Sequence, residues 1–418
     1  MIPVSVVVIG AGLIGPRHAE LVLKNSNCSL FAIVDRSAKG PSIASSCGTL
    51  HFQSIHDMLE FCDNHDANYP DAAVVCTPND SHAEITVVLA EKGIHVLVEK
   101  PMASSAVDCI KMIDVCEKNN VKLLIGHHRR FNPYISATKS HMHRIGSPVA
   151  VQGVWALKKH QAYFDEKAWR RSRFLGGGAI LINLIHDLDL LQYLLGPVIR
   201  VYAELMPRQR QAEGKDNHVD EGAVLTLRFA NGCCGTFLCS DNVTSPYSFE
   251  AGTGENPLIP MHPDVAGFYR IFGSSGTLSV PDLTLYHQDN FSLRENSWWN
   301  PIQSESLGGV YQENDCMYVD DFSAITPPSS FEEKEANFGP ATQKLPKPFD
   351  LQLGHFINLI TGAETDVKCS GYDALQSMLC IEAVTRSINQ GIAQTIQTAE
   401  ELRAGFQGHE SHQQPFFT

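Results

Sequence analysis

An excess of positive charge is missing from this sequence: 32 Lys and Arg residues stand against 46 Asp and Glu residues, giving a formal net charge of −14. A protein that binds nucleic acid needs a basic surface to neutralise phosphates, so we expect no nucleic-acid partner. The sequence also lacks an apolar run of the ~18 residues that a membrane-spanning helix needs, so we expect no membrane partner. No basic segment precedes the first apolar stretch, which therefore does not resemble a secretion signal, and we expect a cytoplasmic protein.

The sequence also lacks the closely spaced Cys and His residues that are typical of metal sites. The sequence has 12 cysteines but no C-x-x-C pair, and the nearest group, Cys233, Cys234 and Cys239, has none of the spacings of a zinc site. His127 and His128 are adjacent, so on a strand they would point to opposite faces, and no carboxylate spacing completes a site around them. We therefore predict no metal ion, and free thiols in a reducing compartment.

Residues 1–126 are predicted to form one domain, because short continuous apolar runs alternate there with longer helical patterns. The predicted strands are residues 4–9, 29–34, 71–76, 94–98 and 122–125, and the predicted helices are residues 16–25, 80–92 and 104–119. Apolar strands separated by helices are typical of a parallel sheet that is covered on both faces. The N-terminal domain is therefore expected to be an α/β domain of the Rossmann type.

Residues 127–418 have a different pattern and are predicted to form a second domain. Longer strands, in places with alternating polar and apolar residues, are expected at 148–158, 198–205, 223–229 and 235–239, with helices at 179–195, 349–362 and 372–391. This pattern predicts an α+β domain built on a mostly antiparallel sheet. The segment 326–348, rich in Pro, Glu, Lys and Ser, is predicted to be a long surface loop, and residues 407–418 a loose tail.

The clearest motif is Gly10-Ala11-Gly12-Leu13-Ile14-Gly15, a G-x-G-x-x-G sequence between the first predicted strand and the first predicted helix. Its first glycine allows a tight turn, the second lets the backbone approach a pyrophosphate, and the third lets helix and strand pack closely. The helix N-terminus adds free N–H groups for the phosphates. Asp35, at the end of the next predicted strand, can accept hydrogen bonds from both ribose hydroxyls, which favours NAD. The adjacent Arg36 could hold a 2′-phosphate, so NADP stays an alternative, as does a glycine turn without a ligand.

Further motifs follow the glycine loop along the chain: His18, Thr77-Pro78-Asn79 with His82, Glu99-Lys100-Pro101, Gly176-Gly177-Gly178 ahead of His186, and Gly354-His355-Phe356-Ile357. In order and spacing, over most of the chain, they resemble the Gfo/Idh/MocA oxidoreductases, which include glucose–fructose oxidoreductase and inositol dehydrogenase. The resemblance implies a two-domain enzyme with a nicotinamide cofactor, a sugar, cyclitol or related polyol as substrate, and a large open sheet that often builds dimers or tetramers. It also implies which residues line the cofactor: Thr77, Pro78, Asn79, His82, Glu99 and Lys100.

Oxidising an alcohol requires that a hydride faces the nicotinamide ring and that some group accepts the hydroxyl proton. The resemblance implies that Lys100 lies beside the reacting carbon, and Lys100 follows a predicted strand, where open α/β sheets bind ligands. A lysine whose pKa is lowered by burial can accept such a proton. We therefore expect Lys100 to be catalytic, with an ordinary surface lysine as the alternative interpretation.

His186 is the second catalytic candidate, and Asn183 and Asp189 lie three residues to either side of it on the same helical stripe. Asp187 is expected to point elsewhere. His186 could relay a proton or hold a substrate hydroxyl, or it could be an ordinary core histidine. Many members of the family carry an aspartate four residues before this histidine, whereas this chain has Ile182, which cannot orient an imidazole or accept a proton. Asn183 and His186 are therefore expected to position the substrate.

Three further residues are weaker candidates for contact with the substrate. Trp169 and Arg170 resemble a segment that approaches the nicotinamide in some members of the family, and Tyr163 is expected at the edge of the substrate pocket. A purely structural role is an equally good interpretation of each of them.

Three functions stay open at this point, and an NAD(P)-dependent dehydrogenase or reductase acting on a CH–OH group is the leading one. Some relatives in the family use NAD transiently, in a redox-neutral elimination or glycoside cleavage, and others are non-enzymatic regulators that sense a dinucleotide. The presence of Lys100 and His186 argues against a pure binding protein, while Ile182 in place of the aspartate leaves some room for one.

Overall fold

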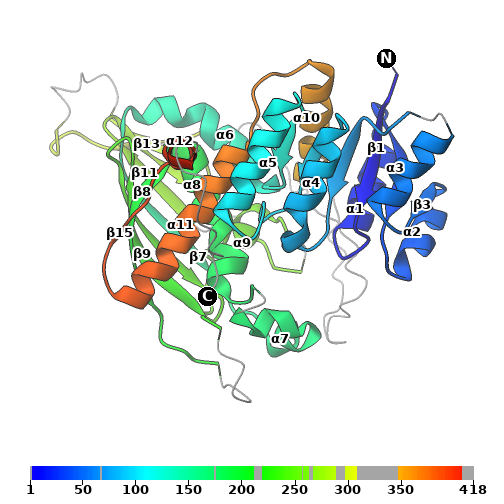
Figure 1. Cartoon of the computed structure of the whole chain (residues 1–418). Coiled ribbons are helices and arrows are strands. Elements are labelled where there is room, and N and C mark those ends of the chain that lie inside the picture. The colour runs from blue at the N-terminus through cyan, green and yellow to red at the C-terminus, as the bar shows by residue number, and fades with distance from the viewer. Residues whose placement is uncertain are drawn as a thin grey trace, which may run out of the picture.

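The computed structural model describes residues 2–65, 68–173, 176–210, 219–256, 258–262, 267–288, 297–307 and 347–406. Two β-sheets lie next to each other, the smaller on the right and the larger on the left of Figure 1. Of the loop predicted at 326–348 only the last two residues are described, and the tail predicted at 407–418 lies outside the described residues. Within the described part, no helix is both long enough and apolar enough to cross a membrane.

The N-terminal sheet has six strands in the order β3-β2-β1-β4-β5-β6, and every pair is parallel, as predicted. The strands are β1 (Val4–Ile9), β2 (Cys28–Val34), β3 (Leu50–Phe52), β4 (Ala72–Val75), β5 (His95–Val98) and β6 (Leu123–Ile125). The helices are α1 (Gly15–Lys24), α2 (Lys39–Cys47), α3 (Ile55–Asn64), α4 (His82–Glu91) and α5 (Ala106–Lys118). Strand order reverses between β1 and β4, and open α/β sheets bind ligands at the carboxyl ends of the strands at such a switch point.

Three elements between β2 and β4 are absent from the sequence-based prediction. The α2 segment contains Gly40, Pro41 and three serines, which are poor helix formers, and β3 is too short to show an alternating pattern. α3 does carry a readable signal, because Ser54 and Asp57 form a capping box. The Ser54 Oγ accepts a hydrogen bond from the Asp57 N–H at 3.1 Å, and the Asp57 carboxylate accepts one from the Ser54 N–H at 3.0 Å.

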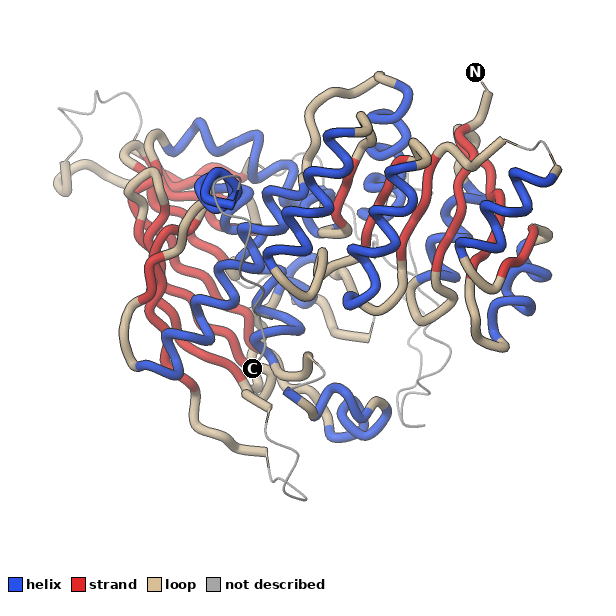
Figure 2. The backbone as a smooth tube through the Cα atoms, viewed as in Figure 1, coloured by secondary structure: helices blue, strands red, loops and turns tan. Residues whose placement is uncertain are grey.

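The second sheet has nine strands in the order β14-β13-β12-β11-β7-β10-β9-β8-β15. They are β7 (Pro148–Ala156), β8 (Val198–Leu205), β9 (Gly222–Phe229), β10 (Cys234–Ser240), β11 (Tyr269–Gly273), β12 (Gly276–Val280), β13 (Thr284–His287), β14 (Gln303–Ser306) and β15 (Gln394–Thr395). β7 and β10 are parallel, and the other pairs are antiparallel, so the prediction of a mostly antiparallel sheet is confirmed. Helices lie against one face of this sheet (Figure 2).

The helices of the second half of the chain serve both sheets. They are α6 (Pro133–His141), α7 (Gln161–Glu166), α8 (Ile185–Leu195), α9 (Phe249–Thr253), α10 (Pro348–Thr361), α11 (Gly371–Gln390) and α12 (Ala399–Phe406). The apolar side of α10 packs into the core of the N-terminal sheet. In α11, Leu375 belongs to that first core and Val384 to the core of the second sheet, so one helix joins both (Figure 1). The helix predicted at 179–195 begins with a π-helical turn, Ile180–Leu184, before α8.

A buried ion pair anchors α8 to the segment that follows β6. Arg130 lies in the 3-10 turn His128–Phe131, and its guanidinium donates to both carboxylate oxygens of Asp189 on α8, at 2.9 and 2.7 Å. Both side chains are almost completely buried. The side-chain atoms of His127, Asp189 and Cys369 that could bind a metal ion lie within 4.8 Å of one another. However, the guanidinium of Arg130 already supplies the positive charge that a metal ion would bring to Asp189.

Breaking this pair should destabilise the fold. Removal of one partner of a buried ion pair costs about 3–5 kcal/mol, so we expect Asp189→Asn to lower the free energy of unfolding by about that amount in urea denaturation. The exposed pair Arg144–Glu305, with an N–O distance of 2.7 Å, is the matched control. Glu305→Gln should change the same quantity by less than about 1 kcal/mol. An equally small effect at Asp189 would contradict its role as a buried anchor.

Candidate active site

The first and last glycines of the loop Gly10–Gly15 are tightly packed against backbone atoms, whereas the middle glycine borders open space. Gly10 has a φ of 98°, and a Cβ there would lie 2.8 Å from the Cys76 carbonyl group. A Cβ on Gly15 would lie 1.9 Å from the Gly10 oxygen, so this position admits only glycine. A Cβ on Gly12 would meet no atom within 4 Å. The two outer glycines therefore shape the loop, and the middle one leaves open space at the N-terminus of α1, where a phosphate would be held.

Asp35 lies at the end of β2 beside this loop. Its carboxylate accepts hydrogen bonds from the backbone N–H groups of Ala11, at 2.6 Å, and Ser37, at 2.7 Å. Burial raises the pKa of Asp35, but the hydrogen bonds from Ser37 and Ala11 outweigh it, so the net pKa is lowered and the group is ionised at neutral pH. Arg36 beside it is exposed to solvent. An ionised carboxylate at this position can accept hydrogen bonds from ribose hydroxyls and repels a 2′-phosphate.

His82 connects the loops that follow β4 and β5. Its Nε2 lies 2.8 Å from the carbonyl oxygen of Thr77, and its Nδ1 lies 3.1 Å from that of Pro101 and 3.2 Å from that of Met102. The ring is buried, and this burial lowers its pKa. His82 therefore positions the loop that carries Thr77, Pro78 and Asn79, and direct contact of these residues with a cofactor stays a prediction.

Glu99 is held underneath the same loop by α1. Its carboxylate lies 2.8 Å from the Nε2 of His18, and its other oxygen accepts the backbone N–H of Lys100 at 3.3 Å. Gly126 allows this arrangement, because a Cβ there would lie 3.0 Å from both the Cα and the carboxylate of Glu99. Burial raises the pKa of Glu99, but His18, His128 and Lys100 together hold it below its usual value. Glu99 is thus a buried carboxylate that supports Lys100 from below.

Lys100 ends up in a half-buried position between the two sheets. Burial lowers the pKa of its ammonium group, with Arg129 and Lys159 adding to this effect, whereas Glu99 and Glu255 oppose it. The net pKa is below that of an exposed lysine, which makes a neutral amine more accessible. A lowered pKa agrees with the proton transfer expected of Lys100, and its catalytic role stays a prediction.

His186 lies on α8, close enough to Lys100 for the charge of that lysine to lower its pKa. Its ring centroid lies 6.4 Å from that of His127 and 5.9 Å from that of His128. Burial, with the charges of Lys100 and Arg129, holds the pKa of His186 well below its usual value, so its imidazole is neutral. Its Nδ1 is buried and has no hydrogen-bond partner among the described residues. A buried ring nitrogen without a partner is costly, and the other ring nitrogen, Nε2, is the one that stays available to a bound group.

Asn183 and Ile182 have different surroundings in the π-helical turn. Asn183 is buried, and its Oδ1 accepts a hydrogen bond of 2.7 Å from the Nζ of Lys159. Ile182 is only partly buried. Asp187, expected to point elsewhere, accepts a 2.5 Å hydrogen bond from Tyr269, and burial raises its pKa to about 7. Asn183 is therefore the polar side chain that this turn contributes.

Besides the carboxylates of Glu250 and Glu255, four polar residues around the site were not among the predicted cofactor or substrate contacts. Arg129 is buried between two carboxylates, with N–O distances of 2.5 Å to Glu250 and 2.8 Å to Glu255. The Trp155 indole donates to Glu250 at 2.8 Å, and His128 lies 2.7 Å from Glu255. The fourth residue is Lys159. These residues have no shared spacing in the sequence, so only the adjacency of Arg129 to the end of β6 could have indicated one of them.

The weaker candidates line a small helical segment. Arg170 is buried, donates to the Tyr163 carbonyl at 2.7 Å and to Glu166 at 2.8 Å, and its guanidinium lies 4.0 Å from the centre of the Tyr163 ring. These contacts connect α7 to the turn that follows it. Trp169 has 39% of its surface exposed. Contact of Tyr163, Trp169 or Arg170 with a substrate stays a prediction.

Comparisons with known proteins agree with this architecture. Residues 4–127 match a family described as an oxidoreductase family with an NAD-binding Rossmann fold, and residues 141–396 match the C-terminal alpha/beta domain of the same family. Myo-inositol 2-dehydrogenase of Thermotoga maritima is 29% identical over 233 residues, which are 54% of this chain and 66% of that protein. 2,7-anhydro-N-acetylneuraminate hydratase of Escherichia coli is 24% identical over 275 residues, which are 64% of this chain and 70% of that one.

Solved structures share the fold at lower identity. The WlbA dehydrogenase from Bordetella pertussis, crystallised with NADH and UDP-GlcNAcA, has 22% identity and a TM-score of 0.63, and the match covers 94% of this chain and 99% of that one. The chain spans 49% to 73% of the length of eight curated relatives that it matches. The structural likeness extends over both sheets.

The open space above Gly12 allows a direct test of dinucleotide binding. A methyl group there meets no protein atom, so we expect Gly12→Ala to fold normally and to weaken NADH binding at least tenfold, measured by fluorescence titration. Gly354→Ala is the matched control, since a Cβ at that position also meets no atom within 4 Å, and it should leave NADH affinity unchanged. Equal NADH affinity in wild type and Gly12→Ala would argue against a pyrophosphate at this loop.

Proposed function

Because the chain belongs to the Gfo/Idh/MocA oxidoreductase family, we propose that it transfers a hydride between a nicotinamide dinucleotide and a CH–OH group of a sugar, cyclitol or related polyol. The observation that carries this proposal is the half-buried Lys100, which follows β5 of the NAD-binding Rossmann fold and lies near the neutral His186. The nicotinamide, when bound, is the hydride acceptor or donor. The chain's own residues provide the binding surface and the proton chemistry.

Lys100 is the group that exchanges the proton of the substrate hydroxyl. Its lowered pKa increases the fraction of neutral amine near neutral pH, and only the neutral amine can accept a proton. Glu99 keeps the lysine backbone in place through the N–H of Lys100. His186 then holds the reacting oxygen through its Nε2, because this nitrogen, unlike the buried Nδ1, is not shut off from solvent and has no hydrogen-bond partner among the described residues.

The charges around the site favour an uncharged substrate. Three nearby cations each pair with a carboxylate within 4 Å: Arg129 with Glu250 and Glu255, Lys159 with Asp241, and Arg170 with Glu166. A substrate phosphate or carboxylate needs a cation that is free to form charge-assisted hydrogen bonds. None of these three cations is therefore free to hold a substrate phosphate or carboxylate, which supports a polyol over a sugar acid.

The ionised Asp35 supports NAD as the cofactor. Its negative charge at the end of β2 would repel the 2′-phosphate of NADP. The match of residues 4–127 to an NAD-binding domain agrees with this choice.

Replacement of Lys100 should lower the rate of the chemical step without weakening the binding of the cofactor. With NAD and a panel of uncharged polyols, we expect wild type to form NADH and Lys100→Met to lower kcat about 10²–10⁴-fold, because general-base catalysis contributes that much. NADH affinity should be nearly unchanged. Lys118→Met, at an exposed lysine of α5, is the control and should retain full activity. Near-normal turnover by Lys100→Met would refute this assignment.

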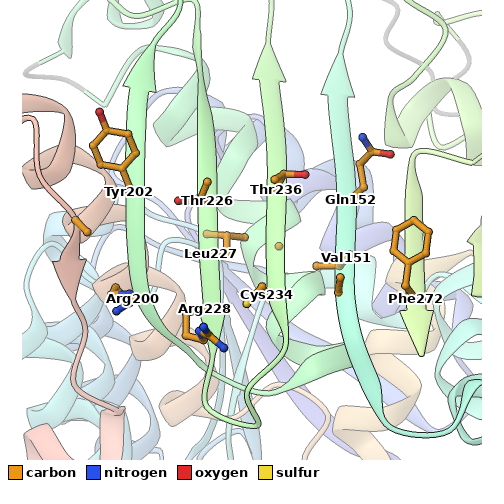
Figure 3. A pocket seen from close by; sticks show the side chains of 13 residues that line it. Val151, Gln152, Arg200, Tyr202, Thr226, Leu227, Arg228, Cys234, Thr236 and Phe272 are labelled. Carbon is orange, nitrogen blue, oxygen red and sulfur yellow. The ribbon is translucent and has the colours of Figure 1, made fainter. Parts of the chain in front are cut away.

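We further propose that the open face of the large sheet pairs with a second copy of the chain. Helices lie behind the sheet in Figure 3, and the front face forms a shallow groove lined mainly by uncharged side chains. Val224 and Phe272 are exposed on this face, with 44% and 37% of their surfaces accessible. Exposed apolar residues gathered on one face are typical of an interaction surface.

The proposed pairing of two chains can be tested by measuring the molar mass of the protein in solution. Wild type should have at least the mass of a dimer in sedimentation experiments. Thr236→Glu should shift it toward the monomer, because a charge would be buried without a partner at the middle of the interface. Lys118→Met is again the control. A monomeric wild type at micromolar concentration would contradict the proposed pairing.

A further inference from the structure

Lys159 is a buried lysine that the proton chemistry above does not use. It lies just beyond the end of β7, where its backbone N–H donates to the carbonyl of Asp241 at 2.9 Å. Only 10% of its side-chain surface is accessible. Its Nζ lies 2.7 Å from the Oδ1 of Asn183, 3.7 Å from a carboxylate oxygen of Asp241, and 4.6 Å from the centre of the Tyr163 ring.

The contact with Asn183 determines which way its amide faces. An ammonium group has three donors and no acceptor, so the atom of Asn183 that faces it must be the carbonyl oxygen. The NH₂ end of the amide then points away from Lys159. Among the described residues, no side chain or backbone group accepts a hydrogen bond from it, and it is not one of the buried polar atoms shut off from solvent. Asn183 therefore offers a donor, not an acceptor, to whatever occupies the site.

We propose that Lys159 is a positioning residue: it locks the amide of Asn183 so that the Asn183 N–H group donates to a hydroxyl or carbonyl oxygen of the substrate. This inference rests on the proposed polyol oxidoreductase activity. It also gives a role to the polar side chain of the π-helical turn. Ile182 of that turn has no side-chain donor, and without Lys159 the amide group of Asn183 could rotate by half a turn and exchange its oxygen and its NH₂ group. π-Helical turns are common at functional sites.

Lys159 is also coupled to the proton acceptor by charge. Its ammonium lowers the pKa of Lys100, together with Arg129, while Glu99 and Glu255 act in the opposite sense. Lys159 itself is surrounded by Asp241, Glu250, Cys239 and Arg210, and burial lowers its pKa. Replacing Lys159 by an uncharged residue therefore removes one cation near Lys100 and should raise the pKa of that lysine. A purely structural residue would not have this effect.

The decisive test is a double-mutant cycle on Lys159 and Asn183 with the best polyol of a panel of myo-inositol, D-glucose and D-glucitol. A hydrogen bond to a charged group is worth about 1.5–3 kcal/mol, so we expect Lys159→Met to lower kcat/KM about 10- to 100-fold. In the Asn183→Ala background, Lys159→Met should lower kcat/KM by less than a further factor of about three. Lys159→Arg, which keeps the charge and the donors, should recover most of the loss.

A second readout follows the pH profile of kcat/KM for polyol oxidation. The rise in activity with pH should move to higher pH in Lys159→Met and stay in place in Lys159→Arg. Independent, multiplicative losses in the cycle, or an unshifted profile with Lys159→Met, would overturn the proposal.

A third readout needs no turnover. The melting temperature of the NADH complex is measured for Lys159→Met in the wild-type and in the Asn183→Ala background. Both single variants lose the same hydrogen bond, so Lys159→Met should lower the melting temperature clearly in the wild-type background. In the Asn183→Ala background the decrease should be less than half as large. If no polyol reacts although NADH binds, the proposed function fails, and this cycle still decides the Lys159–Asn183 interaction. Equal shifts in the two backgrounds would refute it.

Discussion

Two consecutive buried arginines hold the site together. Taking a charge out of water costs several kcal/mol, and this cost is offset only when a well-placed partner is present. Arg130 is paired with Asp189 of α8, and Arg129 with Glu250 and Glu255. Both arginines lie in the 3-10 turn His128–Phe131 that comes after β6, so these pairs fix the position of the second sheet's helices relative to the last strand of the first. The placement of His186, on α8, near Lys100 depends on that junction.

The same charges set the protonation states of the site. Arg129 and Lys159 lower the pKa of Lys100, and Lys100 and Arg129 hold His186 neutral. Glu99, anchored by His18, limits how far the pKa of Lys100 falls. The groups that the proposed chemistry needs, a lysine able to lose its proton and an imidazole able to share a hydrogen bond, therefore arise from electrostatics that both halves of the chain supply.

Local patterns were sufficient for part of this structure. The strand Val4–Ile9, the glycine loop and the strand ending before Glu99 follow from apolar runs and glycine spacing. The same patterns did not reveal α2 or β3, where poor helix formers and a three-residue strand leave little signal. Contacts of Glu250 and Glu255 with Arg129 join residues more than a hundred positions apart, and no periodicity records such a contact.

By itself the sequence determined the parallel character of the first sheet, the mostly antiparallel character of the second and the choice of Lys100, His186 and Asn183 as candidates, because strand patterns and short motifs depend on neighbouring residues. Only the tertiary structure decided their partners. It placed His82 between two loops and brought Lys159, from the segment after β7, against Asn183 of the π-helical turn. Burial, ion pairing and pKa are properties of the assembled surroundings, so they emerge only when distant segments meet.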